Sequence, residues 1–195
     1  EWYYFIFILF ISFLTFLIKY IKWEYGLYLI KIKISKIHSF QIFLYSLTMS
    51  ITPGKIGDLL KSYLLKKSDS IPVSQSSPII LVERITEFLS LLFICFIGIA
   101  LFEDWLLLLI LITIALVLIT MIFANEKLAN IFLQNLLKIK FLKKHINNLA
   151  KALSHARQLL KPKSFLIMMF ISLVAWIVEG FILYLILQYL DVGLS

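Results

Sequence analysis

One uncharged apolar run sets the strongest constraint on what this chain can fold into. Residues 105–125 carry no charged side chain, and this length, at ~1.5 Å per helical residue, is enough to cross a hydrocarbon core of ~30 Å. Hydrophobic residues make up 62% of the 195 residues and charged ones only 15%, against roughly 25% charged in soluble domains. Shorter uncharged runs occupy residues 2–18, 37–54, 88–102 and 164–178. The sequence therefore predicts an all-α, polytopic integral membrane bundle forming one domain over residues 1–195.

The basic residues cluster in two segments, and this clustering predicts the topology. Segments 19–36 and 126–163 hold most of the 19 Lys and Arg residues, so the positive-inside rule makes both cytoplasmic. The acidic pair at 103–104 precedes 126 by one span and is expected outside. No nucleic-acid-binding pattern accompanies the positive charge, which anionic lipid headgroups explain more simply. We therefore expect a multi-pass protein of the cell membrane whose partners are lipids and not nucleic acid.

This topology requires an unusual path between residues 37 and 67. The helix predicted over 79–102 must start inside, so the Ser- and Pro-rich loop 68–78 is also cytoplasmic, and the intervening chain enters and leaves on one side. Residues 37–51 can descend ~22 Å and residues 56–67 can climb back ~18 Å as helices. The chain breaks between them at Thr52-Pro53-Gly54, and Gly57 follows. The prediction is a re-entrant broken-helix hairpin; if 55–67 is instead an outside loop, the two basic segments lie on opposite sides.

A different pattern covers residues 126–161. Apolar residues recur there at steps of three and four from Leu128 to Leu160, which defines one face of a helix, and Pro162 ends the pattern. The composition predicts an amphipathic helix at the bilayer interface or on the bundle. A partner-binding helix is the alternative.

Charged residues of the hairpin would lie below the headgroup level. Ionisable groups are costly there, pair with one another and usually mark a substrate path. Asp58 and Lys61 share a helix face and can pair. The helix N-terminus after Gly54, together with Lys55 and Lys61, favours an anion such as a lipid phosphate.

The following helices add further ionisable residues. Glu83 and Glu87 share one face, from which Arg84 is offset by about 100°, so the three should not all point the same way. Glu179 lies inside the last apolar run, where it can pair with a hairpin cation. The alternative for each residue is a purely structural ion pair, such as Asp58–Lys61 or Glu83–Arg84.

Signals for catalysis are missing from the sequence. His38, His145 and His155 lack metal-ligand spacing, and no Walker A, GxGxxG or G-x-S-x-G motif occurs. The single cysteine, Cys95, lies in an apolar run. We expect no catalytic residue, no metal and no cofactor.

Several of these stretches together resemble a known family. "SITPGKIGDLLKSYLL" at 50–65 and "PIILVERITEF" at 78–88 resemble the signature of the lysylphosphatidylglycerol synthase/flippase transmembrane-domain family. "KYIKWEYGLYL" at 19–29 and "WIVEGFILYLILQYLDVGLS" at 176–195 resemble two further landmarks. The family positions match Pro53, Gly54, Gly57, Asp58, Lys61 (often arginine), Glu83, Arg84, Trp176 and Glu179.

The resemblance implies lipid translocation, or support of a lipid-linked glycan or aminoacyl-lipid pathway. The family normally continues into a second Pro-Gly-Gly hairpin, which these 195 residues do not contain, and its synthase activity belongs to a separate soluble domain, so we expect no enzyme here. In the leading hypothesis a phospholipid or polyprenyl-phosphate headgroup enters a cavity beside the hairpin. Phosphate is attracted by Lys55, Lys61 and Arg84, which are oriented by Asp58, Glu83, Glu87 and Glu179. The alternatives are a membrane anchor or accessory of a glycosyltransferase or aminoacyl-lipid synthase, and a structural scaffold.

Overall fold

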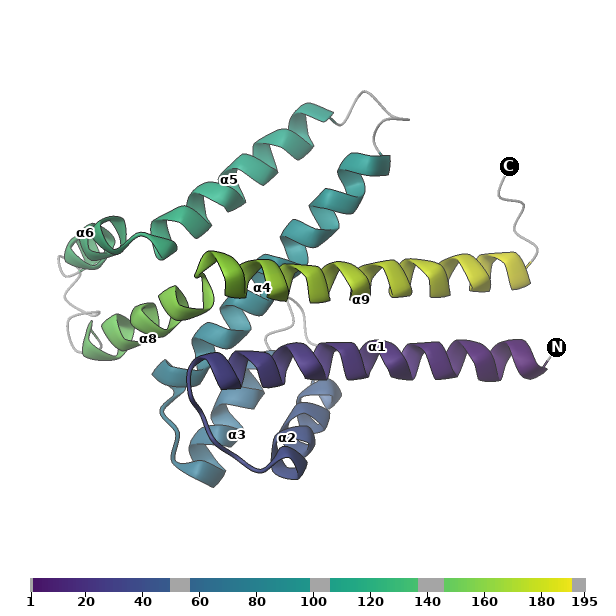
Figure 1. Ribbon diagram of the computed structural model, residues 1–195, viewed down its shortest axis with the longest axis horizontal. Coiled ribbons are helices and arrows are strands. Elements are labelled where there is room, and N and C mark those ends of the chain that lie inside the picture. Colours follow the sequence, from purple (N-terminus) through teal and green to yellow (C-terminus); the bar gives the residue numbers. More distant parts are fainter. Residues whose placement is uncertain (1, 50–56, 99–105, 137–145, 191–195) are drawn as a thin grey trace.

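The computed structural model describes residues 2–49, 57–98, 106–136 and 146–190, and α-helices make up nearly all of that part of the chain. Three of these helices are long and apolar enough to cross a membrane, namely α1, α5 and α9. The all-α prediction is thus confirmed. The helices, labelled in Figure 1, are α1 (Trp2–Leu29), α2 (Lys36–Thr48), α3 (Leu59–Asp69), α4 (Val73–Gly98), α5 (Leu106–Ala124), α6 (Glu126–Leu136), α8 (Ile146–Leu159) and α9 (Pro162–Tyr189).

α1 and α9 run antiparallel, side by side, along their whole length (Figure 1). The rings of Tyr4 and Tyr189 lie 6.4 Å apart at one end of the pair. α9 turns a stripe of mostly small buried residues inward, at steps of three and four: Ser164, Met168, Ser172 and Ala175. Small side chains let helices approach closely in lipid, where no hydrophobic force drives them together. α1 continues past its predicted end at residue 18 to Leu29, and Lys22, Trp23, Gly26 and Leu27 of this extension are buried.

α4 crosses α9 and forms the centre of the packing (Figure 1). It begins at Val73, so the prediction of a loop over 68–78 is wrong for its second half; Pro78 lies inside the helix, near its start. A Cβ built on Gly26 would come within 2.5 Å of the Ile79 side chain, which shows how closely α1 and α4 pack. Ser90 donates a hydrogen bond of 2.9 Å to the carbonyl of Met169 on α9.

α2 and α3 form a pair of short helices beneath α1. Their 13 and 11 residues correspond to about 20 and 16 Å, less than a hydrocarbon core of ~30 Å. The start of α2 and the end of α3, which are the outer ends of the pair, meet, because His38 Nε2 lies 3.0 Å from Asp69 Oδ2. The end of α2 and the start of α3, its inner ends, also meet, since a Cβ on Gly57 would lie 2.1 Å from the carbonyl oxygen of Met49. The predicted break at Pro53-Gly54, and Lys55 beside it, lie outside the described residues.

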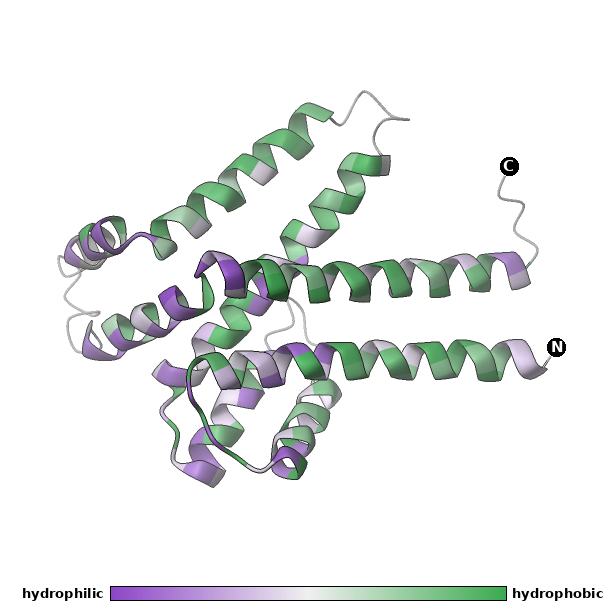
Figure 2. Ribbon diagram, viewed as in Figure 1, coloured by the Kyte–Doolittle hydropathy of each residue, from purple (hydrophilic) through white to green (hydrophobic). Residues whose placement is uncertain are grey.

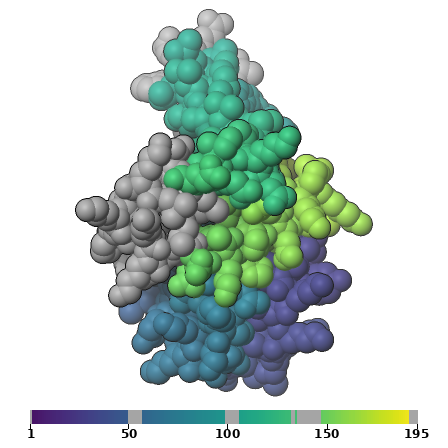
Figure 3. Space-filling model, turned by 90° about the vertical axis from the view of Figure 1, so that its left-hand side faces the viewer, coloured from purple at the N-terminus to yellow at the C-terminus, as the bar shows by residue number. Residues whose placement is uncertain are grey.

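The amphipathic segment predicted over 126–161 contains α6 and α8, and residues 137–145 between them lie outside the described part. α8 packs on α4 and buries Leu153, Ala156 and Leu159. An ion pair of 3.1 Å between Arg157 and Glu126 links it to α6. Figure 3 shows this face of the molecule, with α8 between α6 and the region of α3. α9 starts directly afterwards with Pro162 in its first turn, where a missing N–H costs nothing.

Polar and apolar residues separate along the long axis of the molecule. The end of α1, the start of α4, the end of α5 and the start of α9 all lie toward one end, together with α6 and α8 (Figure 1). Polar residues concentrate there, whereas α5 and the far halves of α1 and α9 are almost uniformly apolar (Figure 2). The acidic pair 103–104 falls outside the described residues. Four helix ends that the charge rule assigns to the cytoplasm are therefore neighbours in space.

Candidate functional site

Four ionisable side chains are buried at the junction of α1, α3 and α4. Lys22, Asp58, Lys61 and Glu83 are 2%, 7%, 3% and 3% exposed. A buried charge is strongly destabilising unless a partner of opposite charge and further hydrogen bonds compensate for lost hydration. The partners of these four residues therefore decide whether the cluster can exist.

Lys61 pairs with Glu83 of the neighbouring helix. Its Nζ lies 2.7 Å from Glu83 Oε2 and 4.6 Å from the ring centroid of Trp23 on α1, within the range of a cation–π contact. The Trp23 indole is itself fixed, because it donates a hydrogen bond of 3.2 Å to Ser39 Oγ on α2. One lysine thus joins α1, α3 and α4.

Arg84 forms the second group of ion pairs. It makes a close ion pair with Asp58, and its Nη1 donates a 2.6 Å hydrogen bond to Glu87 Oε2. The pairs named for the structural alternative, Asp58–Lys61 and Glu83–Arg84, are therefore not the ones formed: the ion pairs Lys61–Glu83 and Arg84–Asp58 join α3 to α4. Because these two helices pack side by side, each side chain reaches an opposite charge on the neighbouring helix.

The expectation that Glu83, Arg84 and Glu87 point apart is also wrong. All three line one cavity of about 170 Å³. The Arg84 side chain is long enough to turn toward Glu87, one helical turn away, so its offset of about 100° does not separate them. Lys22, Asp58 and Lys61 line the same cavity.

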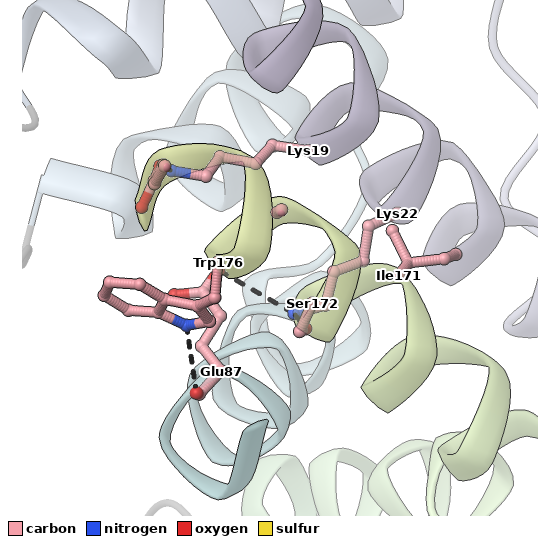
Figure 4. A pocket seen from close by; sticks show the side chains of 8 residues that line it. Lys19, Lys22, Glu87, Ile171, Ser172 and Trp176 are labelled. Carbon is pink, nitrogen blue, oxygen red and sulfur yellow. Dashed lines mark hydrogen bonds and ion pairs between the residues drawn. The ribbon is translucent and has the colours of Figure 1, made fainter. Parts of the chain in front are cut away.

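Lys22 has an unusual set of partners. It donates hydrogen bonds of 2.9 Å to the backbone carbonyl of Glu83 and 2.6 Å to Ser172 Oγ, and its nearest carboxylate oxygen, on Glu87, is 3.7 Å away. Glu87 is therefore shared by Lys22 and Arg84. Trp176 of α9 adds a 3.1 Å hydrogen bond to the Glu87 carbonyl. Figure 4 shows these groups converging from α1, α4 and α9.

Glu179 lies at the edge of this cluster and pairs closely with Lys19 of α1, and not with a cation of the hairpin. Both line a second space of about 10 Å³, room for about one water molecule, shown in Figure 4. Lys19, Lys22 and Glu87 line this space as well as the larger cavity, so they form the wall between the two.

Lys19 and Lys22 are the site residues that sequence reasoning missed. Both were assigned to a cytoplasmic polar segment beginning at 19. A usable signal exists, because Lys22 continues the spacing of Ile11 and Thr15, which are buried on the same helix. Extending the first helix through its lysines would have placed them on that inner face.

Two buried polar atoms in the cavity wall accept or donate no hydrogen bond within the described part of the protein. Asp58 Oδ2 contacts the Arg84 guanidinium without hydrogen-bond geometry, and Arg84 Nε has no acceptor. Buried polar atoms normally find partners, so the Arg84 Nε–H is a donor that a polar ligand could satisfy. Within the described ranges, no group of three or more His, Cys, Asp or Glu side chains is placed to hold a metal ion.

Comparison with known proteins is informative at the level of the family. The Lysylphosphatidylglycerol synthase TM region family matches residues 1–195, the whole chain. No curated protein and no solved structure shows a significant match. The landmarks of the resemblance also meet in space, since Trp23, Lys61, Glu83, Arg84 and Trp176 all contribute to the cluster described above. The chain is a membrane protein that belongs to the lysylphosphatidylglycerol synthase TM region family.

Proposed function

We propose that this chain is the membrane region of a lipid flippase, which takes the headgroup of a phospholipid or polyprenyl phosphate into the cavity beside α2 and α3 and passes it across the cell membrane. The observation that carries the proposal is the buried charged cluster around a cavity of about 170 Å³, within a bundle of otherwise apolar helices. Ionisable groups inside a membrane bundle are costly, and they typically line substrate paths.

The geometry of α2 and α3 supports a re-entrant hairpin. Both helices are too short to span, and the contact between His38 and Asp69 brings the entry and exit together. Such broken helices are tolerated where protein buries them or where they line a polar cavity. With the basic ends of α1 and α9 cytoplasmic, the hairpin enters from the cytoplasm, and the cavity lies at its inner end, beside Ser46, Leu47 and Asp58.

The proposal gives each charged residue a role. Lys61 and Arg84 contact the phosphate, with Lys22 behind them, while Asp58, Glu83, Glu87 and Glu179 hold these cations in place before the headgroup arrives. Lys55, assigned to phosphate from the sequence, lies outside the described residues. The proposal assigns no catalytic step to this chain, so any aminoacyl- or glycosyl-transfer would belong to a partner.

Neutralising one buried pair tests the proposal without leaving an unpaired charge. In the full-length protein that carries this chain, Lys61→Met/Glu83→Gln removes both charges, and such replacements are often neutral for stability. Transbilayer movement of an acyl-labelled phospholipid in proteoliposomes, measured by dithionite quenching, should fall at least about tenfold, since a hydrogen bond to a charged group contributes ~1.5–3 kcal/mol.

The matched control is Arg157→Met/Glu126→Gln, which removes the pair between α6 and α8, whose carboxylate is exposed and whose arginine is half-buried. It should leave the movement of lipid unchanged. If the folded Lys61→Met/Glu83→Gln protein moves lipid at the rate of the unmodified protein, the cluster is structural and the assignment of the path is wrong.

A further inference from the structure

The charges around the cavity are balanced. In the described part of the chain, Lys19, Lys22, Lys61 and Arg84 each have a carboxylate oxygen within 4 Å. The four carboxylates involved belong to Asp58, Glu83, Glu87 and Glu179, so the cluster as a whole has no net charge. A site for an anion alone would be expected to present unpaired cations.

This balance penalises a headgroup that carries only negative charge. A phosphate that takes Arg84 from Asp58 leaves the Asp58 carboxylate buried, and a buried carboxylate without a partner is strongly destabilising. A headgroup that also carries a positive charge avoids this penalty, because its cation replaces Arg84 beside Asp58. Both new contacts are then ion pairs, and the net charge of the site stays the same.

The Asp58–Arg84 pair fits such a ligand. Asp58 Oδ2 contacts the Arg84 guanidinium, and Arg84 Nε has no acceptor within the described part of the chain. A phosphate oxygen can accept from Arg84, and an ammonium N–H can take the place of the guanidinium beside Asp58. The two side chains are in contact, as the short separation of phosphate and amine in a small headgroup requires.

The volume restricts the size of the headgroup. A cavity of about 170 Å³ is smaller than the ~300–1,000 Å³ typical of sites for drug-sized ligands. It has room for one small headgroup and excludes an oligosaccharide. The lipid-linked glycans implied by the resemblance are therefore poor occupants of this space.

From these observations we infer that the cavity selects a zwitterionic phospholipid headgroup with a phosphate and a primary ammonium, the phosphate binding Arg84 and the ammonium binding Asp58, while Lys61 stays paired with Glu83. This inference rests on the proposed function and names its substrate class. The four charges of headgroup and site form two ion pairs, whereas an anionic headgroup forms one and leaves a carboxylate buried.

The test compares three labelled lipids in proteoliposomes that hold the full-length protein. They are acyl-labelled phosphatidylethanolamine, which has the ammonium, acyl-labelled phosphatidylglycerol, which lacks it, and chain-labelled polyprenyl phosphate. We expect phosphatidylethanolamine to cross at least about tenfold faster than the other two, the discrimination typical of a site whose buried polar group is otherwise left unpaired. Equal or faster movement of either anionic lipid overturns the inference and leaves the flippase proposal standing, whereas no protein-dependent movement of any lipid overturns both.

Asp58→Asn then identifies the ammonium partner. The substitution keeps the shape and removes the charge, so the ratio of phosphatidylethanolamine to phosphatidylglycerol rates should fall about tenfold. Asp69→Asn, at the outer end of the same hairpin, is the matched control and should keep the ratio of the unmodified protein. A ratio is measured within one preparation, so a partly unfolded variant does not imitate the effect; an unchanged ratio in Asp58→Asn contradicts the role of Asp58.

Discussion

α4 and α5 follow one another in the chain and are stabilised in opposite ways. α4 has ten buried residues, among them Glu83, Thr86 and Ser90, and contacts α1, α3, α8 and α9. α5 has no charged residue and no buried one (Figure 2). The uniformly apolar helix buries no residue, because lipid can surround an apolar side chain as well as protein can. The helix that carries the polar residues lies at the centre of the packing, with apolar and polar side chains buried together.

The largest expected effect concerns the buried charge on α4, and a pair between α6 and α8 is its comparison because α5 has no charged residue. Glu83→Gln leaves Lys61 buried and unpaired, which should lower the free energy of unfolding by about 3–5 kcal/mol. Glu126→Gln removes an exposed carboxylate from its pair with the half-buried Arg157 and should lower this free energy by less than about 1 kcal/mol. Unfolding by SDS in mixed micelles measures both values.

Lys61, the partner of Glu83, provides the check on the first value. Lys61→Met added to Glu83→Gln should recover most of the lost stability, since no unpaired charge then remains. If the two substitutions are additive, the ion pair between α3 and α4 is absent from the folded protein.

A smaller difference is expected at two glycines. Gly57→Ala would place a methyl group against the backbone of Met49 and push α2 from α3, at a cost of about 1–3 kcal/mol typical of overpacking. Gly180 on α9 has no atom within 4 Å of a built Cβ, so Gly180→Ala should hold or raise the stability. Thermal unfolding in detergent distinguishes them; equal melting temperatures would show that the hairpin arms are not in close contact.

The smallest difference in stability is expected between two valine-to-alanine substitutions, one on α4 and one on α5. Val82 on α4 is fully buried, so Val82→Ala leaves a cavity and should cost about 1–2 kcal/mol. Val117 on α5 is only partly buried, and Val117→Ala should change the stability by less than about 0.5 kcal/mol. A cost for Val117→Ala as large as that for Val82→Ala would mean that α5 packs as tightly as α4.

Much of the fold could be predicted from the sequence where composition alone decides it. α5 starts at Leu106, within one residue of the start of the predicted span, because a long uncharged run between charged residues is difficult to interpret in any other way. α1 and α4 were predicted too short at one end, because Lys19 and Pro78 look like helix ends and instead lie inside helices. The spacing of a polar residue can place it on the buried face of its helix but does not show which helix it faces.

The candidate site was predictable in its residues and not in its pairs. Lys61, Glu83 and Arg84 were identified because each lies beside an apolar run and matches a position of the family signature. Periodicity gives the face of one helix and does not give its neighbour, so it favoured Asp58–Lys61 over the pairs that the packing makes. Lys19 and Glu179 are separated by 160 residues, and no local pattern connects them.

The sequence separation of these partners also has a consequence for the order of assembly. Glu83 follows Lys61 by 22 residues, so this pair can form as soon as α4 has been synthesised. Ser172 and Glu179 follow Lys22 and Lys19 by 150 and 160 residues. Because a nascent chain emerges from its N-terminus, Lys22 can meet Glu83 and Glu87 once α4 has been made, whereas Lys19 must wait for α9, the last helix described. Until then Lys19 needs water or headgroups as partners, which holds the end of α1 at the membrane surface and makes the docking of α9 the step that closes the polar site.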